Sequence, residues 1–168
     1  TSGNNVLIGV AGVATLTGGD GNDTLDGGLG EDTVDGDAGD DRISMLVTTG
    51  NRDAIDAGAD NDTLVLSGVA PGTRAVVVDL SQADQVVSIG GVAEVLGQSN
   101  FEHLNAAGLS GFVTVTGSAG NNTFIGSSGN DSLDGGAGDD IMSGGRGNDS
   151  YTVDSVSDVV TEAASAGI

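Results

Sequence analysis

A nine-residue repeat organises most of the chain and limits the folds open to it. Each line of the repeat follows the frame Gly, Gly, any, Gly, any, Asp, any, apolar, any. The lines occupy residues 9–17, 18–26, 27–35, 36–44, 48–56 and 57–65, and then 108–116, 117–125, 126–134, 135–143 and 144–152. Repeats of this length are too small to fold alone and become stable by stacking on their neighbours, so the pattern predicts a solenoid.

The eighth slot of each line indicates the secondary structure. It carries one apolar residue between mostly polar neighbours, which is typical of a very short strand with a single buried face. These residues are Leu16, Leu25, Val34, Ile43, Ile55, Leu64, Val115, Phe124, Leu133, Met142 and Tyr151. Glycine in the first, second and fourth slots allows a tight turn before each strand. We therefore expect an all-β fold, a parallel β-roll in which two lines form one coil of a right-handed solenoid.

The repeat is interrupted once, and the interruption divides the chain into segments. We expect a first roll block at 1–65, a strand-rich insertion at 66–107, a second roll block at 108–152 and a flanking segment at 153–168. Both ends of the sequence look cut from a longer polypeptide. A smaller departure, MLV at 45–47, is expected to loop out of the stack.

The insertion contains strand signals of its own. VVVDL at 76–80 and VVSI at 86–89 are rich in β-branched residues and predict strands, and GG at 90–91 predicts a turn after the second of them. We favour a widened set of coils, or a small β-layer, that joins the two blocks, because the segment contains no dense polar cluster. The alternative is a ligand-binding insertion that projects from the roll.

The charge of the chain disfavours several classes of partner. The 168 residues carry 25 acidic and 4 basic side chains, for a formal net charge of -21. Nucleic acid and anionic membrane surfaces are disfavoured because phosphate contacts need clustered Lys and Arg. There is no Cys for a disulfide or a thiolate site, no apolar run long enough to span a bilayer and no signal peptide at the start. Unneutralised charge of this size predicts a disordered chain.

The sixth slot concentrates the acidic charge. Aspartate occupies it at Asp23, Asp32, Asp41, Asp53, Asp62, Asp131, Asp140 and Asp149. In a coil of two lines, this slot stacks on the sixth slot two lines later, so Asp23 is expected to face Asp41, and Asp41 to face Asp62. Two carboxylates about 4 Å apart repel by roughly 4 kcal/mol at an effective dielectric constant near 20. Such pairs oppose folding unless a cation lies between them.

Ca²⁺ is the cation that suits this geometry, because it accepts about six to eight oxygen ligands, backbone carbonyls included, in a tolerant arrangement. Mg²⁺ needs stricter octahedral geometry and retains its water. Transition metals favour imidazole or thiolate, and the chain has one His and no Cys. The best sites are expected where 18–23 meets 36–41, where 36–41 meets 57–62 and where 126–131 meets 144–149.

The predicted calcium ligands are of two kinds. The carboxylate ligands are Asp20, Asp23, Asp32, Asp41, Asp53, Asp62, Asp131, Asp140 and Asp149. The backbone-carbonyl ligands are Gly18, Gly36, Ala38, Ala59, Gly126, Ser128, Gly144 and Arg146. Some lines depart from the frame: Ala14 and Val113 bring no ligand oxygen to the sixth slot, and Asn122 brings a neutral one. Arg52, next to Asp53, puts the pairing of that aspartate with its partner in the preceding coil in doubt.

These lines, from GGDGNDTLD at 18–26 to GGRGNDSYT at 144–152, resemble the calcium-binding nonapeptides of the RTX (repeats-in-toxin) family. The resemblance covers 1–65 and 108–152. It implies a calcium-filled β-roll, export of a large bacterial parent protein by type I secretion machinery, and folding outside the cell, in a secreted or cell-surface location. FEHLN at 101–105 is similar to the strand that leads back into a roll in this family.

Nothing in the sequence indicates catalysis. GLSGF at 108–112 lacks the G-x-S-x-G spacing of a nucleophile elbow, and neither HExxH nor a P-loop occurs. His103 is expected to pack or to form a hydrogen bond rather than to bind metal or act as a base. We therefore expect a non-catalytic calcium-binding structural module that is disordered without Ca²⁺. The alternative is an adhesin-type binding module that uses 66–107 to contact a glycan or a protein surface.

Overall fold

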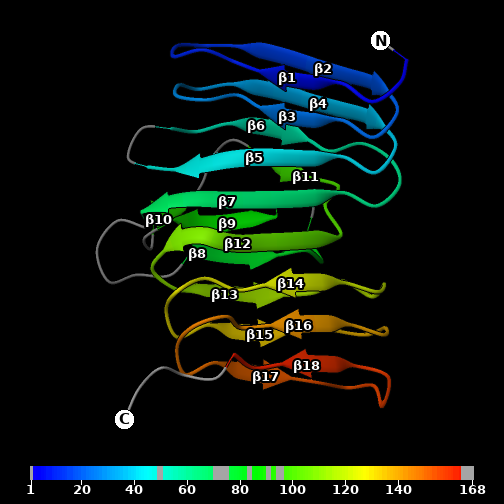
Figure 1. Ribbon diagram of the computed structural model, residues 1–168, viewed down its shortest axis with the longest axis vertical. Coiled ribbons are helices and arrows are strands. Elements are labelled where there is room, and N and C mark those ends of the chain that lie inside the picture. Colours follow the sequence, from blue (N-terminus) through cyan, green and yellow to red (C-terminus); the bar gives the residue numbers. More distant parts are fainter. Residues whose placement is uncertain are drawn as a thin grey trace.

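The computed structural model describes residues 2–48, 51–69, 76–82, 85–89, 92–93 and 97–163. Strands are the only regular secondary structure in these segments, and none of the segments forms a helix that is long and apolar enough to cross a membrane. The strands lie in two facing layers and stack one after another from the N-terminus to the C-terminus, along the longest axis of the molecule (Figure 1).

The largest sheet has 8 strands and runs the whole length of the stack, in the order β1-β3-β5-β7-β12-β14-β16-β18. Its strands are β1 (Val6–Ile8), β3 (Thr24–Asp26), β5 (Arg42–Val47), β7 (Thr63–Val69), β12 (His103–Ser110), β14 (Thr123–Ile125), β16 (Ile141–Ser143) and β18 (Val159–Thr161). All neighbouring pairs in it are parallel. Because β12 pairs with both β7 and β14, the sheet continues across the interruption of the repeat.

The other strands form two shorter sheets. The 4-stranded sheet has the order β11-β6-β4-β2 and the 6-stranded sheet the order β10-β9-β8-β13-β15-β17. The strands of the first are β11 (Gln98–Ser99), β6 (Ala54–Asp56), β4 (Thr33–Ala38) and β2 (Thr15–Asp20). Those of the second are β10 (Val92–Ala93), β9 (Val86–Ile89), β8 (Val76–Asp79), β13 (Val113–Thr116), β15 (Ser132–Asp134) and β17 (Ser150–Thr152). Only β8–β9 and β9–β10 are antiparallel among the described pairs.

The core is a narrow file of apolar side chains between the layers. In the 8-stranded sheet, the register places the buried eighth-slot residues in one continuous row with a residue of the interruption. The row contains Leu25, Ile43, Leu64, Leu104, Phe124 and Met142, all fully buried. Val34, Ile55, Val115 and Leu133 face them from the shorter sheets. The predicted all-β parallel β-roll is therefore confirmed.

The segment MLV at 45–47 does not loop out, so that prediction is wrong. It extends β5, in which Met45 and Val47 are fully buried and pair with residues of β7. The burial of the segment is that of a strand: Ile43, Met45 and Val47 are buried and alternate with the half-buried Ser44 and Leu46, and this two-residue period is that of a strand with one buried face.

The interruption forms strands that belong to the stack. VVVD at 76–79 and VVSI at 86–89 are β8 and β9, as predicted. The predicted turn at 90–91 lies outside the described residues. β8 pairs in parallel with β13 of the second block, and β12 links the two blocks in the long sheet. Widened coils therefore describe this segment better than a projecting domain does.

Candidate metal centre

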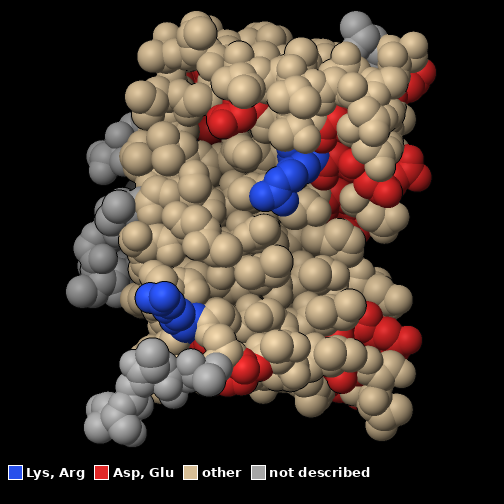
Figure 2. Space-filling view, viewed as in Figure 1, with Lys and Arg blue, Asp and Glu red and all other residues tan. Residues whose placement is uncertain are grey.

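Sixth-slot residues of alternate lines, with Glu102 and Asp158 in equivalent positions, form a column along one edge of the 8-stranded sheet. Each lies directly before a strand of that sheet, so the strand register stacks them one above another. The column contains, in order, Asn5, Asp23, Asp41, Asp62, Glu102, Asn122, Asp140 and Asp158. In Figure 2, acidic side chains gather along the edge where these turns lie. The column is unbroken from the first block to the second.

One carboxylate oxygen of each aspartate in the column is bound to the backbone of the preceding turn. Asp41 Oδ1 accepts a hydrogen bond from the N–H of Asp23 at 2.7 Å, a residue 18 positions earlier. Asp62 Oδ1 accepts from the N–H of Asp41 at 2.8 Å, across a longer step of 21 residues that includes the MLV extension. The same bond joins Asn122 N–H to Asp140 at 2.8 Å. These bonds bring together the pairs that the sequence predicts.

The second carboxylate oxygen is buried and has no hydrogen-bond donor. This applies to the Oδ2 atoms of Asp23, Asp32, Asp41, Asp62, Asp140 and Asp149. A buried acceptor without a partner costs about 1–3 kcal/mol, and a charged one costs more. Within the described residues, no three His, Cys, Asp or Glu side chains gather at one point. The open oxygens instead recur turn after turn, which suits a row of cations that also take backbone carbonyls as ligands.

Glycine in the first slot leaves the space in which those oxygens converge. A Cβ on Gly36 would collide with Asp41 Oδ2 and with the carbonyl oxygen of Ala57 in the following turn. A Cβ on Gly126 would likewise collide with the carbonyl oxygen of Gly144. Each cradle is therefore lined by a carboxylate oxygen of one turn and a carbonyl oxygen of the next. An oxygen-lined cradle of this kind fits Ca²⁺.

The third-slot carbonyls of the first block are engaged in backbone hydrogen bonds. The carbonyl oxygen of Asp20 accepts from Gly3 N–H at 2.6 Å, and that of Ala38 from Gly21 N–H at 2.8 Å. The carbonyl oxygen of Ala59 accepts from Gly39 N–H at 3.2 Å. A carbonyl oxygen has two lone pairs, so each keeps one for a cation.

The third-slot residues of the second block lie at a surface hollow. Ser128 and Arg146, both predicted carbonyl ligands, line a hollow of about 420 Å³ there. The first-slot residue Gly126 lines the same hollow, so three of the predicted backbone ligands of the second block are neighbours in space.

The opposite edge of the roll carries two shorter columns. In the second block, the N–H of Asp131 donates to Asp149 Oδ1 at 2.8 Å, so the predicted pair is stacked. Asp131 Oδ2, however, accepts a hydrogen bond from Ser127 N–H at 2.7 Å. In the first block, the N–H of Asp32 donates to Asp53 Oδ1 at 3.1 Å, and Asp53 Oδ2 accepts from the Asn51 side chain at 3.2 Å. Asp32 and Asp149 therefore keep an open oxygen, whereas their partners do not.

Burial perturbs the protonation of these carboxyls. Desolvation raises the pKa of Asp62 to about 7, and the charges of its acidic neighbours add to the effect. Desolvation likewise raises the pKa of Asp53 to about 6. The pKa values of Asp41 and Asp140 are also raised, with burial as the main cause. The pKa of Asp158 is lowered, chiefly by the hydrogen bond from the Asp140 N–H. The buried carboxylates are thus destabilised as anions when no cation is bound.

Two members of the long column were not predicted from the sequence. Asp62 N–H donates to Glu102 Oε2 at 2.9 Å, and Asp140 N–H donates to Asp158 Oδ1 at 3.0 Å. Neither residue stands in a nonapeptide line. A signal for both was present, because each carboxylate lies two positions before a strand residue, Leu104 or Val160, that continues the eighth-slot row.

His103 and a hollow over the 4-stranded sheet lie outside these columns. His103 Nδ1 accepts a hydrogen bond from the Thr123 N–H at 3.1 Å, which confirms that this histidine serves hydrogen bonding.

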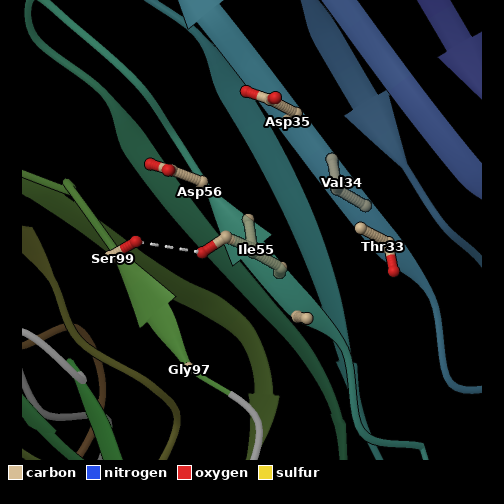
Figure 3. Close-up of a pocket in the computed structure, with 8 residues that line it drawn as sticks. Thr33, Val34, Asp35, Ile55, Asp56, Gly97 and Ser99 are labelled. Carbon is tan, nitrogen blue, oxygen red and sulfur yellow. Dashed lines mark hydrogen bonds between the residues drawn. The ribbon is translucent and has the colours of Figure 1, made fainter.

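A hollow of about 240 Å³ lies over β4, β6 and β11. In Figure 3, the carboxylates of Asp35 and Asp56 point to the same side of this hollow, and Ser99 Oγ donates to the Ile55 carbonyl oxygen at 3.5 Å.

Comparison with known families gives one match. The model of the RTX calcium-binding nonapeptide repeat (4 copies) matches residues 8–43, 46–68 and 116–151, more than half of the chain. All of the sixth-slot aspartates predicted as ligands lie inside these segments, whereas Glu102 and Asp158 lie outside them. A search of curated proteins finds no match.

Proposed function

The chain belongs to the RTX calcium-binding nonapeptide repeat family, and from this premise we propose that it is a calcium-responsive structural module whose roll folds when Ca²⁺ binds. The observation that carries the proposal is the set of buried carboxylate oxygens that lack a hydrogen-bond donor and recur from turn to turn. Calcium is the ion that the repeats bind. When bound, it supplies positive charge to the stacked carboxylates, and that charge offsets their repulsion and desolvation.

The residues that would hold the ions follow from the columns. In the first block, the turns 18–23, 36–41 and 57–62 supply Asp23, Asp41 and Asp62, together with the carbonyls of Gly18, Gly36, Ala38 and Ala59. In the second block, Asp140 and Asp149 offer the open carboxylate oxygens. We rank the cradles at Asp131 and Asp53 below these, because protein donors already occupy both oxygens of each carboxylate.

Without Ca²⁺ the proposed state is a disordered chain, since a net charge of -21 then remains unneutralised. Extracellular modules bind Ca²⁺ with dissociation constants of roughly 10⁻⁴–10⁻³ M. Binding to the folded state alone stabilises it by RT ln(1 + [L]/Kd) for each site. This supports a chain that stays unfolded during type I secretion and folds at the cell surface or beyond it, where Ca²⁺ is abundant. We assign the chain a structural rather than a catalytic role. We also propose the roll blocks 1–65 and 108–152, as predicted from the sequence.

The proposal is tested by circular dichroism during a calcium titration from a chelated start, with Mg²⁺ as the control. We expect a cooperative change from coil to β structure with Ca²⁺ and little change with Mg²⁺. A chain that is already fully folded in chelator would show that the carboxylates do not prevent folding, and calcium-driven folding would then be rejected.

A second candidate, an adhesin-type binding module, draws on the hollow that Gly97 and Ser99 of the interruption share with β4 and β6. Deletion of 66–107 is a poor test because it removes β12 from the long sheet. Substitution of Asp56→Asn, compared on a glycan array with the unchanged chain in Ca²⁺, leaves the sheet in place. Loss of a glycan signal with normal calcium-driven folding would support this candidate, and the absence of any glycan or protein ligand would count against it.

A further inference from the structure

We propose that Asp62 and Glu102 form a calcium site that fastens the interruption to the first roll block. The inference rests on the proposed function but adds a site that no nonapeptide line supplies, since Glu102 lies outside the segments that match the family. Its ligands come from residues 40 positions apart in the sequence.

The strand register places Glu102 in a sixth-slot position. β7 pairs with β12 so that Thr63 lies beside His103, which puts the residues before them, Asp62 and Glu102, beside each other. The Asp62 N–H donates to Glu102 Oε2 at 2.9 Å. This is the same bond, from the same backbone position, that every aspartate of the column accepts from the turn before it. Glu102 therefore replaces an aspartate in the stack.

A buried oxygen of Asp62 that lacks a hydrogen-bond donor is a second, independent observation that indicates a bound cation. Asp62 is fully buried, its Oδ1 accepts the Asp41 N–H, and its Oδ2 has no donor. The following turn contributes the carboxylate of Glu102, so one carboxylate stacks on the next as in the nonapeptide pairs, with Ala57 in place of the first-slot glycine. A charge-assisted hydrogen bond alone satisfies the backbone N–H but leaves the second oxygen and the like charges without compensation.

Hydrogen bonds to the preceding and the following turn hold the backbone of Glu102 in place. The N–H groups of Glu102 and His103 donate to the Asp62 carbonyl oxygen at 3.2 and 2.9 Å. The side-chain amide of Asn122, in the next turn, donates to the Glu102 carbonyl oxygen at 2.7 Å. The site is thus positioned from the first block and from the second. Calcium accepts glutamate oxygens as readily as aspartate oxygens.

The test compares Glu102→Gln with Glu31→Gln. Glutamine keeps an oxygen that accepts the Asp62 N–H, so the substitution removes charge and largely spares the fold. Glu31 is an exposed glutamate in the fifth slot of a nonapeptide line, and its substitution removes the same charge from outside the column. Calcium stoichiometry is measured by isothermal titration, and amide hydrogen exchange is measured in parallel at 57–63 and 98–105.

We expect Glu102→Gln to bind one ion fewer than the unchanged chain, and to lose calcium-dependent exchange protection at the Asp62 amide and around it. Glu31→Gln should match the unchanged chain in both measurements. Equal stoichiometry and equal protection in the two variants would overturn this site while leaving the proposed function intact. Failure of the unchanged chain to bind Ca²⁺ would instead overturn the proposed function itself.

Discussion

Asp41 lies in the middle of the first-block column, so its substitution by asparagine should stabilise the fold far more without calcium than with it. Asparagine keeps an oxygen for the Asp23 N–H, which Asp41 Oδ1 accepts at 2.7 Å, and removes only the charge. Neighbouring strands of a sheet lie about 4.8 Å apart, and at that distance two charges repel by about 3 kcal/mol at an effective dielectric constant of 20. Asp41 has two such neighbours, Asp23 and Asp62, so in chelator Asp41→Asn should stabilise the fold by up to about 6 kcal/mol.

In saturating calcium the same substitution should lose most of this gain. Asp41 faces both Asp23 and Asp62, so it contributes to two successive sites. Each ion adds about 2.7 kcal/mol at a calcium concentration a hundred times Kd. The loss of about 5 kcal/mol from two ions cancels most of the gain of about 6 kcal/mol from relieved repulsion, which leaves a net gain of only about 1 kcal/mol.

The assay is urea unfolding followed by circular dichroism, in chelator with a stabilising osmolyte and again in millimolar Ca²⁺. The control is Asp60→Asn, which removes one exposed charge from the turn that carries Asp62; Asp60 has a φ of 89°, which asparagine accommodates. If Asp41→Asn changes the stability of the chain equally in both conditions, or behaves like the control, the carboxylate is only a hydrogen-bond acceptor and the reasoning fails.

Three further outcomes are expected. Gly36→Ala should raise the calcium midpoint of folding strongly, because its Cβ would enter an oxygen-lined cradle. Gly120→Ala, whose Cβ would meet only Ser118 Oγ at 3.8 Å, an ordinary van der Waals contact, should leave the midpoint unchanged; equal midpoints would contradict the cradle. In chelator, β-structure content measured by circular dichroism should increase as the pH falls from about 7 towards 3.8, because the folded carboxyls of Asp62 (pKa about 7) and Asp53 (about 6) bind protons before the unfolded ones at 3.8 do; a decrease would contradict the burial of these groups. Leu104→Ala should cost about 2–5 kcal/mol in urea unfolding with unchanged calcium stoichiometry, since this side chain is fully buried in the core row and binds no ion.

The repeat frame predicted the parts of the fold that depend on a fixed period. A spacing of 18 residues brings Asp23 to Asp41 and Asp131 to Asp149, and the eighth-slot residues to the core. The frame wrongly predicts a loop at 45–47, because three extra residues do not fit the nine-residue period. Continuation of the strand is favoured instead, because it buries Met45 and Val47.

The rest of the column was not predicted because its members share a place in the sheet and not a sequence motif. Glu102 follows a single glycine at 97 rather than a glycine-rich turn, and Asp158 follows the valine- and serine-rich stretch 153–157. Strand pairing over 40 residues fixes the first of them, and such pairing leaves no local trace in one sequence. The cradles could not be ranked from the sequence either, because the donors that satisfy Asp131 are the N–H groups of Val113 and Ser127 and the Ser127 hydroxyl.

The continuity of the long sheet through β12 has a consequence for how the molecule melts. In a linear array each repeat contacts only its nearest neighbours, so one weak interface is enough to split unfolding into separate transitions. Here β12 pairs on one side with β7 and on the other with β14, and the row Leu64, Leu104 and Phe124 has no gap. The nearest-neighbour coupling therefore passes through the interruption. In calcium, the two blocks should unfold as one cooperative unit, with a single calorimetric peak whose enthalpy corresponds to both.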